Sequence, residues 1–576
     1  MQRMDKKAVA EALEQIAAFM ELKGENPFRV RTFRTVSRVV GGLPGPLAEA
    51  LANGSLAATK GVGPASLEIV RELAEAGRSS LLEELREQVP PGLVEMLAIS
   101  GLGVAKIRQI HETLAIDSLP ELEAAATDGR LAQLPRFGQK TADNIRKSIA
   151  FLRQASAFKL CHHAAEETRS LLEGLERLPG VLRAVPAGEV RRRMEVVREL
   201  VVVLVADVPP AELARRLGQL PGVHEFASQD DRRVTLRFAG GSSVQIVVTP
   251  PVNAGAVLAH TTGSESHLEE LGAHAAARGF NLTGAALWRG SEFVATPDEE
   301  ALYGALGLAW IAPELREGQG EVEAAAAAAL PALLERPELK GFLHCHTQYS
   351  DGSVTVEELA RTVHAAGYAW LGITDHSQSA AYAGGLKPAD LARQAAEIDR
   401  VNASIPGFRI LKGIEADILA DGRLDYEDGV LAGLDFVIGS IHSRFNMGGE
   451  EMTARVLAAL DSPYLTILGH PTGRLLLSRD AYPIDMEAVF TRAAARGVAI
   501  EINADPHRLD LDWRLLRRAR AAGVSISIGA DAHNLAGLDN VEYGIGVARK
   551  GWLGAADVLN TRSAEEFLAF ARHRRG

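Results

Sequence analysis

The pattern of apolar and polar positions changes along the chain, and each pattern predicts a different kind of structure. Residues 1 to about 155 place apolar side chains at helical spacing, as in Val9-Leu13-Ile16-Ala17-Met20, with glycine turns between short helices. From about 156 to 250, β-branched runs such as EVVRELVVVLVAD, VTLRF and SSVQIVVT predict strands, and a GGSS turn joins the last two. We expect an all-α region followed by an α+β region.

The rest of the chain alternates helical and strand-like stretches. Residues 251–319 return to helix and short strand, and the alanine-rich segment 320–340 predicts a helical linker. Strand-like pieces follow it: GFLHCHT, AWLGITDHS, RILKGIEADI, LDFVIGSIHS, LTILGHP, VAIEINA and VSISIGADAH. Strands that alternate with helices are typical of a (βα) barrel, where functional side chains lie at the carboxyl ends of the strands.

Composition adds a few limits to this picture. The chain has 576 residues, 47% of them hydrophobic and 24% charged, which is enough for several domains with cores. It has two cysteines, Cys161 and Cys345, and its sequence contains no signal-like core or membrane-spanning apolar stretch, so we expect a cytoplasmic protein. The net charge of −12 predicts that any binding to nucleic acid uses local basic patches and backbone donors.

Side chains that can bind metal ions stand at the ends of the predicted barrel strands. Two other histidines, His364 in a helical segment and His507 in a loop, lack this placement. The predicted ligands are six imidazoles and three carboxylates: His344, His346, Asp351, His376, Glu415, His442, His470, Asp531 and His533.

The spacing of these residues predicts which way they point. Residues i and i+2 of a strand share a face, so His344 and His346 point the same way. Asp531 and His533 have the same spacing. Cys345 then points into the barrel wall, and we interpret it as a core residue rather than a ligand.

The number of ligands predicts a cluster of ions, because one zinc ion takes about four ligands and this set could hold two or three ions. Clustered divalent ions can convert water to hydroxide near neutral pH and stabilise both sides of an in-line displacement at phosphorus. The predicted chemistry is phosphoester hydrolysis, with Asp351 and Glu415 as candidate catalytic carboxylates. Mixed imidazole and carboxylate ligands suit Mn²⁺ and Zn²⁺.

The N-terminal region repeats a glycine turn that enters a helix. Gly-apolar-Gly turns occur in LAATKGVGPASLEIV and MLAISGLGVAKIRQI, and a third copy, LPRFGQKTADNI, has Arg136 where the first glycine belongs. Backbone N–H groups at such helix starts can donate to phosphates, so these helix-hairpin-helix turns predict DNA binding without reading of base sequence. A dinucleotide-binding turn is the alternative, but no strand precedes these turns. The candidate DNA-binding residues are Gly61, Gly63, Gly101, Gly103, Lys106, Gly138 and Lys140.

The barrel motifs resemble the polymerase and histidinol phosphatase (PHP) domains. HCH, the YSDG loop, ITDHS, GIEADI, GSIHS, LGHPTGR and GADAH match them over roughly 340–576. The resemblance implies three metal positions. The first would be held by His344, His346, Glu415 and Asp531, the second by Glu415, His442 and His470, and the third by Asp351, His376 and His533.

From end to end the chain resembles the bacterial family X DNA polymerases. GENPFRVRTFR, AGEVRRRMEVVRELVVVLV, TTGSESH and TPDEEALYGALGLAWIAPELREGQGEVEAA match parts of them. The resemblance implies a multidomain fold with an all-α helix-hairpin-helix region, an α+β nucleotidyltransferase-like palm and thumb, and a distorted (βα) barrel of PHP type. The implied domains are an N-terminal DNA-binding domain (1–90), fingers (91–155), palm (156–250), thumb (251–319), linker (320–340) and PHP nuclease (341–576).

The implied palm departs from the family pattern. Family members carry Asp-x-Asp on one strand and a third Asp on its neighbour, where this chain has Glu199, Val201 and Gln245. Glu199 is then the one candidate catalytic carboxylate, and Glu189 places a further negative charge near the triphosphate position. The implied nucleotide-binding residues are Gly188, Arg191, Arg192, Thr262, Gly263 and Ser264.

The resemblance implies a DNA repair enzyme with a 3′-to-5′ exonuclease in the barrel. Its gap-filling polymerase activity, with Mn²⁺ or Mg²⁺ in the palm, is expected to be weak. Lyase activity is not expected, because Ile69 stands where relatives carry a lysine. The implied partners are gapped, nicked or broken DNA with 3′ ends and deoxynucleotides, without a membrane and near the nucleoid. Two alternatives are a non-catalytic DNA-end-binding module fused to a PHP phosphoesterase, and a small-molecule phosphatase.

Overall fold

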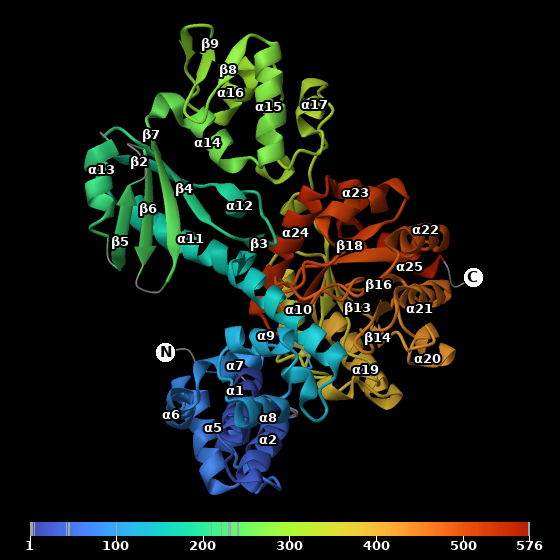
Figure 1. The fold of residues 1–576 in the computed structure, drawn as a ribbon. Helices are drawn as coiled ribbons and strands as arrows, with labels where there is room; N and C mark the ends of the chain where they lie inside the picture. The colour runs from blue at the N-terminus through green and yellow to red at the C-terminus, as the bar shows by residue number, and fades with distance from the viewer. Residues whose placement is uncertain are drawn as a thin grey trace. The chain divides into compact units, whose positions relative to one another are not determined.

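The computed structural model divides the chain into two compact units (Figure 1). One contains Met1–Ala157 with the short segments His346–Thr355 and Ala380–Leu386, and the other contains Phe158–Cys345, Val356–Ser379 and Lys387–Gly576. The structure describes residues 4, 6–41, 43, 47–99, 101–208, 210–220, 222–228, 232–238 and 241–573, so the start of the predicted GGSS turn lies outside the described residues.

The first unit is helical, as the apolar periodicity predicts. Its apolar helix faces meet in one core that runs from Val9 to Ile149. The helices are α1 (Lys6–Leu22), α2 (Pro27–Gly41), α3 (Leu47–Ala52), α4 (Ser55–Ala58), α5 (Pro64–Ala76), α6 (Ser80–Gln88), α7 (Pro91–Met96), α8 (Val104–Leu114), α9 (Leu119–Thr127) and α10 (Gln139–Ser156).

The three predicted hairpin turns share one backbone shape. Each contains a left-handed residue two positions before the helix cap: Gly61 has φ +98°, Gly101 has φ +78° and Arg136 has φ +71°. Helices α5, α8 and α10 then begin after Gly63, Gly103 and Gly138. Arg136 therefore keeps the turn of the other two copies, although a side chain in this region costs roughly 1 kcal/mol.

The second unit begins with a five-stranded sheet in the order β2-β4-β7-β6-β5. Its β4 and β7 are parallel neighbours, and the other pairs are antiparallel. Residues alternate between two apolar clusters along β4: Leu200, Val202 and Leu204 pack on one side, and Val201 and Val203 on the other. The strands are β2 (Val181–Pro186), β4 (Leu200–Ala206), β5 (Val223–Ser228), β6 (Arg233–Phe238) and β7 (Ser243–Thr249).

Helices cover both faces of this sheet. The first cluster packs against α11 (Cys161–Leu175) and α13 (Pro210–Leu217), and the second packs against α14 (Ala254–Thr262). Short elements complete the region: β1 (Lys159–Leu160), which pairs with β3 (Val196–Val197), and α12 (Gly188–Arg191).

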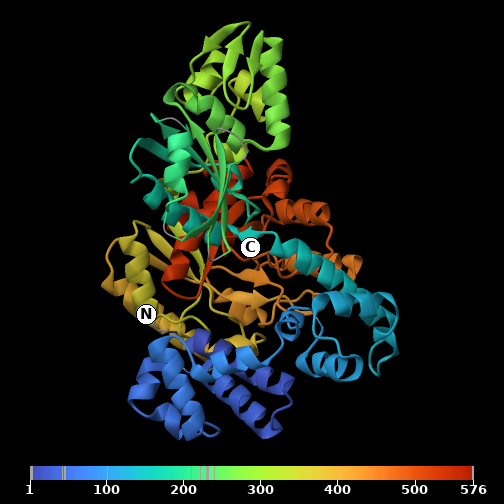
Figure 2. The same cartoon turned by 60° about the vertical axis from the view of Figure 1, so that its left-hand side comes forward.

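Residues after the sheet form a small subdomain that continues from it through α14 (Figure 2). A three-stranded antiparallel sheet stands beside its helices. The elements are α15 (Glu265–Ala277), β8 (Phe280–Leu282), β9 (Leu287–Arg289), β10 (Glu292–Val294), α16 (Glu299–Ala305), a 3₁₀ turn η3 (Pro313–Leu315) and α17 (Glu321–Ala326). The helical linker predicted over 320–340 is wrong for most of its length, because only α17 is an α-helix there and Val322 and Ala325 pack into the subdomain core.

The last part of the chain forms a curled, eight-stranded parallel sheet with the order β13-β12-β11-β18-β17-β16-β15-β14. The strands are β11 (Gly341–Cys345), β12 (Trp370–Ile373), β13 (Arg409–Lys412), β14 (Glu415–Asp417), β15 (Ile438–Ser440), β16 (Ile467–Leu468), β17 (Ala499–Asn503) and β18 (Ile526–Ala532). Helices connect them: α18 (Val356–Ala365), α19 (Pro388–Ser404), α20 (Asp428–Ala432), α21 (Gly449–Asp461), α22 (Met486–Arg496), α23 (Trp513–Ala521), α24 (Val541–Lys550) and α25 (Ala564–Arg572).

One predicted barrel strand is divided in two. RILKGIEADI reads as one strand, but Gly413 and Ile414 interrupt it, and β13 and β14 lie at the two edges of the curled sheet. A Cβ atom at Gly413 would lie 2.5 Å from the Phe436 ring and 2.6 Å from the Ile373 carbonyl oxygen, so the chain passes through a space that admits only glycine. This bend brings the edge strands together and nearly closes the barrel.

Buried polar contacts join the barrel to the rest of the second unit. The Lys550 ammonium group of α24 lies 2.5 Å from the Glu317 carboxylate and 3.1 Å from the Arg192 carbonyl oxygen. The Trp513 indole and the Arg514 guanidinium donate to the Glu195 carboxylate over 3.1 and 2.6 Å. Within the described residues, no helix is long and apolar enough to cross a membrane.

Candidate metal centre

The carboxyl ends of the barrel strands carry the predicted ligands, as the sequence pattern indicates. His344 lies in β11 and Asp531 in β18, while His442 and His470 follow β15 and β16. The prediction that each ligand closes a strand or begins the loop after it is wrong for Glu415, because this residue opens β14 after the Gly413 bend.

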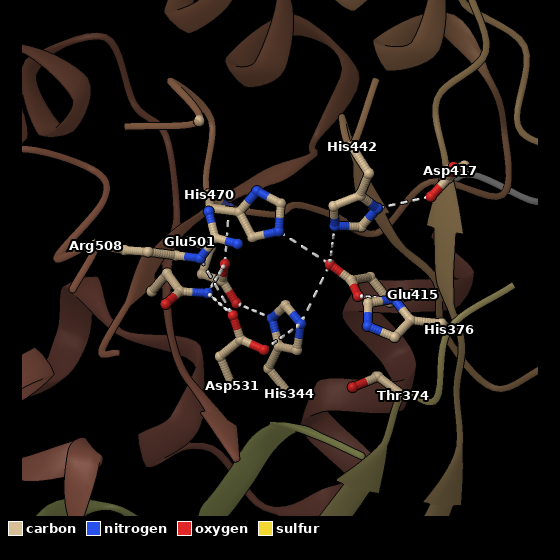
Figure 3. A network of polar contacts seen from close by, with 12 residues as sticks. His344, Thr374, His376, Glu415, Asp417, His442, His470, Glu501, Arg508 and Asp531 are labelled. Atoms are coloured by element: carbon tan, nitrogen blue, oxygen red, sulfur yellow. Dashed lines mark hydrogen bonds and ion pairs between the residues drawn. The ribbon is translucent and has the colours of Figure 1, made fainter. Parts of the chain in front are cut away.

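Glu415 stands at the centre of these side chains (Figure 3). Its Oε1 atom lies 3.0 Å from His470 Nε2, 3.3 Å from His442 Nε2 and 3.4 Å from His344 Nε2. Its Oε2 atom lies 2.8 Å from His376 Nδ1. One buried carboxylate therefore faces four imidazoles, which is the arrangement expected of a ligand shared by two ions.

The ligand atoms form overlapping groups in which every atom lies within 4.8 Å of the others. The residues of the three groups are His344, His346 and Asp531; His376, Glu415 and His442; and His346, Asp351, His376 and His533. Among the groups that the described residues form, none includes His470, which instead contacts Glu415. Imidazole nitrogens and carboxylate oxygens at this spacing fit divalent ions, while the division of ligands among ions stays a prediction.

Backbone strain marks three of these residues. His344, His470 and Asp531 have φ of +60°, +23° and +50°, the left-handed region that non-glycine residues rarely adopt. The pairing of β11 with β18 also shifts register between Leu343 and Cys345. The simple alternation of strand faces is therefore broken at His344, and the cluster forms through this irregularity rather than through regular strand geometry.

Electrostatics favour the ionised carboxylate at the centre. Burial would raise the pKa of Glu415, but the imidazoles around it, His442 first, hold its pKa well below the usual range. Burial opposes a charge on His442, yet Glu415 and Asp417 raise its pKa to about 10. The imidazoles therefore favour the ionised form of Glu415, and a bound divalent cation would favour it in the same way.

Cys345 lies outside this chemistry, as predicted. Its side chain is fully buried, and burial raises the pKa of its thiol well above the usual range. A protonated thiol is a poor metal ligand, because the thiolate is the binding form.

Carboxylates that sequence reasoning missed hold the predicted ligands. Glu501 of β17 accepts from His344 Nδ1 at 2.5 Å and from the His470 backbone N–H at 2.8 Å. Asp417 lies 2.7 Å from His442 Nδ1. Such contacts fix which ring nitrogen faces the site. The signal in the sequence was a carboxylate inside an apolar strand, VAIEIN, where burial demands a partner.

Comparison with known proteins places these features in one family. Residues 257–317 match the DNA polymerase beta thumb, 343–505 the PHP domain, 4–79 a helix-hairpin-helix domain and 93–150 a SAM-like helix-hairpin-helix tandem. A protein of Bacillus subtilis described as DNA polymerase/3′-5′ exonuclease PolX is 36% identical over 99% of this chain and 100% of its own. The chain belongs to the bacterial family X DNA polymerases.

Other relatives share the barrel part of this family X chain alone. A probable phosphatase of Caldanaerobacter subterraneus is 33% identical over 28% of this chain and 60% of its own, and one of Syntrophotalea carbinolica is 30% identical over 28% and 64%. The chain spans less than two thirds of these phosphatases.

The residues that the resemblance assigns to the palm carboxylate positions lie on or beside neighbouring strands, and the assignment itself stays a prediction. Val201 on β4 stands directly opposite Gln245 on β7, which confirms that these positions are on neighbouring strands. Val201 packs in the apolar cluster with Val203 and Val247. Glu199 is exposed and precedes β4, and the Glu189 carboxylate accepts from the Arg198 backbone N–H at 2.5 Å.

The predicted nucleotide-binding residues lie near one another, and carboxylates of the protein pair with the two arginines among them. Arg191 pairs with Glu299 at 2.6 Å and donates to the Thr262 hydroxyl at 2.9 Å. Arg192 pairs with Glu317 at 2.9 Å and donates to the Thr262 carbonyl oxygen at 2.7 Å. The other three predicted residues stand at helix ends. Gly188 begins α12, Gly263 ends α14, and Ser264 caps the start of α15. Their role toward a nucleotide stays a prediction.

Most glycines of the predicted hairpin turns have open space beside the backbone, whereas a Cβ atom at Gly61 would lie 2.8 Å from the Thr35 methyl carbon. A Cβ atom built on Gly63, Gly103 or Gly138 would meet nothing within 4 Å. Lys140 is exposed, whereas Lys106 donates to the Gly101 carbonyl oxygen at 2.9 Å.

No amine is present at the position where, by the resemblance, relatives carry the lysine of the lyase activity. Ile69, on α5, packs against the helical core, and Lys60 is exposed on the turn.

Proposed function

We propose that this chain is a DNA repair enzyme whose barrel hydrolyses DNA phosphodiesters from the 3′ end. The observation that carries this function is the cluster around Glu415, in which imidazoles and carboxylates from six barrel strands and the loops after them meet inside a chain similar along its whole length to a DNA polymerase/3′-5′ exonuclease. The described fold and the family support both parts.

The metal ligands follow from the groups described above. We assign His344, His346, Glu415 and Asp531 to one ion, Glu415, His442 and His470 to a second, and Asp351, His376 and His533 to a third. Ions bound there, Mn²⁺ or Zn²⁺, would supply Lewis acidity and an activated water for phosphodiester hydrolysis.

The side chains of the barrel have distinct roles in this proposal. Glu415 is almost fully buried and orients the imidazoles around it. Asp351, the most exposed predicted ligand with 35% of its side chain accessible, stands where a substrate and water enter and is our candidate for proton transfer.

Polymerase activity is expected to be weak, because the palm lacks two of three carboxylates. Metal-assisted nucleotidyl transfer needs carboxylates on facing strands, and here an apolar Val201 side chain faces a neutral Gln245 amide. Glu199 remains as the one candidate catalytic carboxylate, with Mn²⁺ or Mg²⁺ as its ion.

A second candidate function for residues 1–320 is DNA-end binding without nucleotidyl transfer. The engagement of Arg191 and Arg192 by buried carboxylates favours it, because these arginines are the groups expected to hold a triphosphate. In this alternative the region positions a 3′ end for the barrel.

DNA is the proposed partner for the helical unit. The glycine turns and Lys140 suit phosphate contacts on gapped, nicked or broken duplexes without base reading. Deoxynucleotides are proposed partners of the palm only. A protein that works on chromosomal DNA belongs with the nucleoid in the cytoplasm, and this location is part of the proposal.

One assay tests these functions together. A labelled primer on a gapped template is incubated with and without deoxynucleotides in Mg²⁺, Mn²⁺ or Zn²⁺, using wild type and the His344→Ala variant. We expect 3′ degradation by wild type, none by His344→Ala, and equal DNA affinity for both. Degradation that persists in the variant would reject the assigned pocket, and release of phosphate from a small monoester without DNA degradation would favour a phosphatase.

A further inference from the structure

Three neighbouring barrel strands carry basic and aromatic residues on the loops that follow them. Strands β15, β16 and β17 lie side by side in the sheet, so the loops at their carboxyl ends meet at one edge. His442 and His470 begin the first two loops, and Arg508 lies on the third. Beyond these residues the loops contain Arg444, Phe445, Arg479 and Tyr482. We name Arg444, Phe445, Arg479, Tyr482 and Arg508 the basic rim.

Contacts hold one guanidinium of the basic rim over an aromatic ring. Arg479 Cζ lies 4.1 Å from the centre of the Phe445 ring, and Phe445 stacks with Tyr482 at 6.2 Å. The Nε and Nη2 atoms of Arg479 donate to the Gly473 carbonyl oxygen over 3.1 and 2.8 Å. Gly473, with φ +62°, packs so closely that a Cβ atom there would lie 2.5 Å from the Tyr482 ring. The orientation of Arg479 is therefore built into the fold.

The arginines of the basic rim differ in how much negative charge lies near them. Arg508 lies 3.5 Å from Asp531, beside the metal ligands (Figure 3). In the part of the chain that the structure describes, no carboxylate lies within 4 Å of the Arg444 or Arg479 guanidinium. Arg444 is exposed with φ +58°, and Arg479 is half-buried. Arg479, which the fold orients without a close carboxylate, suits an anionic ligand from outside, and the exposed Arg444 adds a second positive charge next to Phe445.

We propose that the basic rim binds the sugar-phosphate backbone of a single DNA strand next to the scissile phosphodiester, and that it selects a polynucleotide over a small phosphate ester. The proposal rests on the proposed nuclease function of the barrel. Planar guanidinium groups match phosphate oxygens and form charge-assisted hydrogen bonds to them. Relatives described as probable phosphatases match the barrel, so a PHP barrel alone does not define the substrate.

The test compares two substrates on the full chain. Wild type, Arg444→Ala, Arg479→Gln and a control, Arg400→Ala, hydrolyse either a labelled oligothymidylate or bis(4-nitrophenyl) phosphate in Mn²⁺. Arg400 is an exposed residue of α19 whose ion partner is Glu397 at 3.7 Å. We expect each rim variant to raise KM for the oligonucleotide about 10-fold, the loss of one charge-assisted contact, with kcat and small-diester hydrolysis within two-fold. The slope of log affinity against log salt should also fall by about 0.7 per lost contact.

The outcomes separate this proposal from the proposed function. An unchanged KM for the oligonucleotide in both variants would overturn the proposal for the basic rim. An equal loss of activity on the oligonucleotide and on the small diester would overturn it too, provided that the variants unfold at the same temperature as the Arg400→Ala control. Because Arg444 is exposed, its variant keeps the test valid if Arg479→Gln unfolds early. If wild type degrades no DNA while His344→Ala also leaves small-diester hydrolysis intact, the proposed nuclease function fails, and the rim proposal fails with it.

Discussion

Glu501 contacts two predicted metal ligands without being a predicted ligand itself. Its carboxylate accepts from the His344 ring and from the backbone of His470, and it is fully buried. A Cβ atom at Gly529 would lie 1.9 Å from Glu501 Oε1, so the neighbouring strand leaves room for this side chain only because residue 529 is glycine. Glu501 is therefore a positioning residue that sets the orientation of both ligands.

The first prediction concerns this positioning. Glu501→Gln keeps the size of the side chain but removes its charge, and we expect metal affinity and nuclease activity to fall about 10- to 100-fold. Titration with Mn²⁺ monitored by thermal unfolding gives a readout independent of turnover. Glu487→Gln, at an exposed position of α22, is the control. Equal Mn²⁺ affinity in Glu501→Gln and wild type would contradict the positioning role.

A buried carboxylate outside the barrel supports a pH-dependent prediction. Both Arg191 and Arg316 pair with Glu299, and although burial acts in the opposite direction, they lower the pKa of Glu299 to about 2. Because the folded pKa is depressed, the stabilisation is complete above the unfolded value near 4.5 and is lost as pH falls toward 2.

Glu299→Gln should therefore lower the free energy of unfolding by about 3 kcal/mol at pH 7, and this difference should shrink below pH 4.5. Urea unfolding at several pH values measures it. Glu300→Gln, the exposed neighbour, should change little at any pH. A Glu299→Gln difference that stays constant down to pH 3 would show that the carboxylate charge is not the source of the stabilisation.

At the scale of elements, the pairing of β4 with β7 determines where metal-binding carboxylates could stand in the predicted palm. Their parallel register sets Val201 opposite Gln245, and their shared face packs against α14. Restoring metal chemistry therefore requires carboxylates on both strands at once, and each would replace a group in or beside an apolar cluster.

We predict that Val201→Asp with Gln245→Asp, in a His344→Ala background, raises single-nucleotide incorporation in Mg²⁺ at least 10-fold, because Mg²⁺ prefers several hard oxygen ligands. Glu199→Asp is added if the pair alone is inactive, since the longer side chain alters the distance to the ion. Primer extension with one deoxynucleotide is the measurement, and a Val203→Asp variant, two residues further along the same strand, is the control. Wild-type extension as fast as that of the restored variant would mean that the alignment of the palm carboxylates is wrong.

The elements of the barrel were more predictable than their irregularities. The alternation of apolar pieces and helices located every barrel strand, with β13 and β14 inside one predicted piece, because local pattern decides where a strand forms. Ligands near strand ends then follow from the barrel fold. The division of RILKGIEADI at Gly413 depends on a ring from Phe436, which is distant in sequence. The left-handed backbone of His344 and the contacts of Glu501 depend likewise on neighbours across the sheet. The pairing of Arg191 with Glu299 joins residues 108 positions apart, and no local pattern reveals it.

At the scale of the molecule, the second unit has a polar junction built around a fully buried lysine. Lys550 is fully buried, pairs with Glu317 and stands 4.5 Å from the centre of a Trp513 ring. The junction links the barrel to both the five-stranded sheet and the subdomain that matches the polymerase thumb.

Lys550→Ala should destabilise the second unit by about 3 kcal/mol, because it leaves part of a buried charge network unpaired. The shift of the urea midpoint measures the effect. The control is Lys412→Ala, whose ammonium pairs with Asp399 at the surface at 2.6 Å, a contact worth about 0 to 1 kcal/mol. Equal shifts for the two variants would indicate that Lys550 is solvated in solution.

One side chain at this junction bears on the history of the protein. Trp552, from the barrel part of the chain, lies in the same hydrophobic core as Leu302, Tyr303 and Leu315 of the thumb. A gene that kept only the barrel would expose this indole, and a gene that kept only the thumb would lose part of its core. Neither part can therefore be removed without a packing cost to the other, so the barrel and the subdomain that matches the thumb are expected to stay together in one gene.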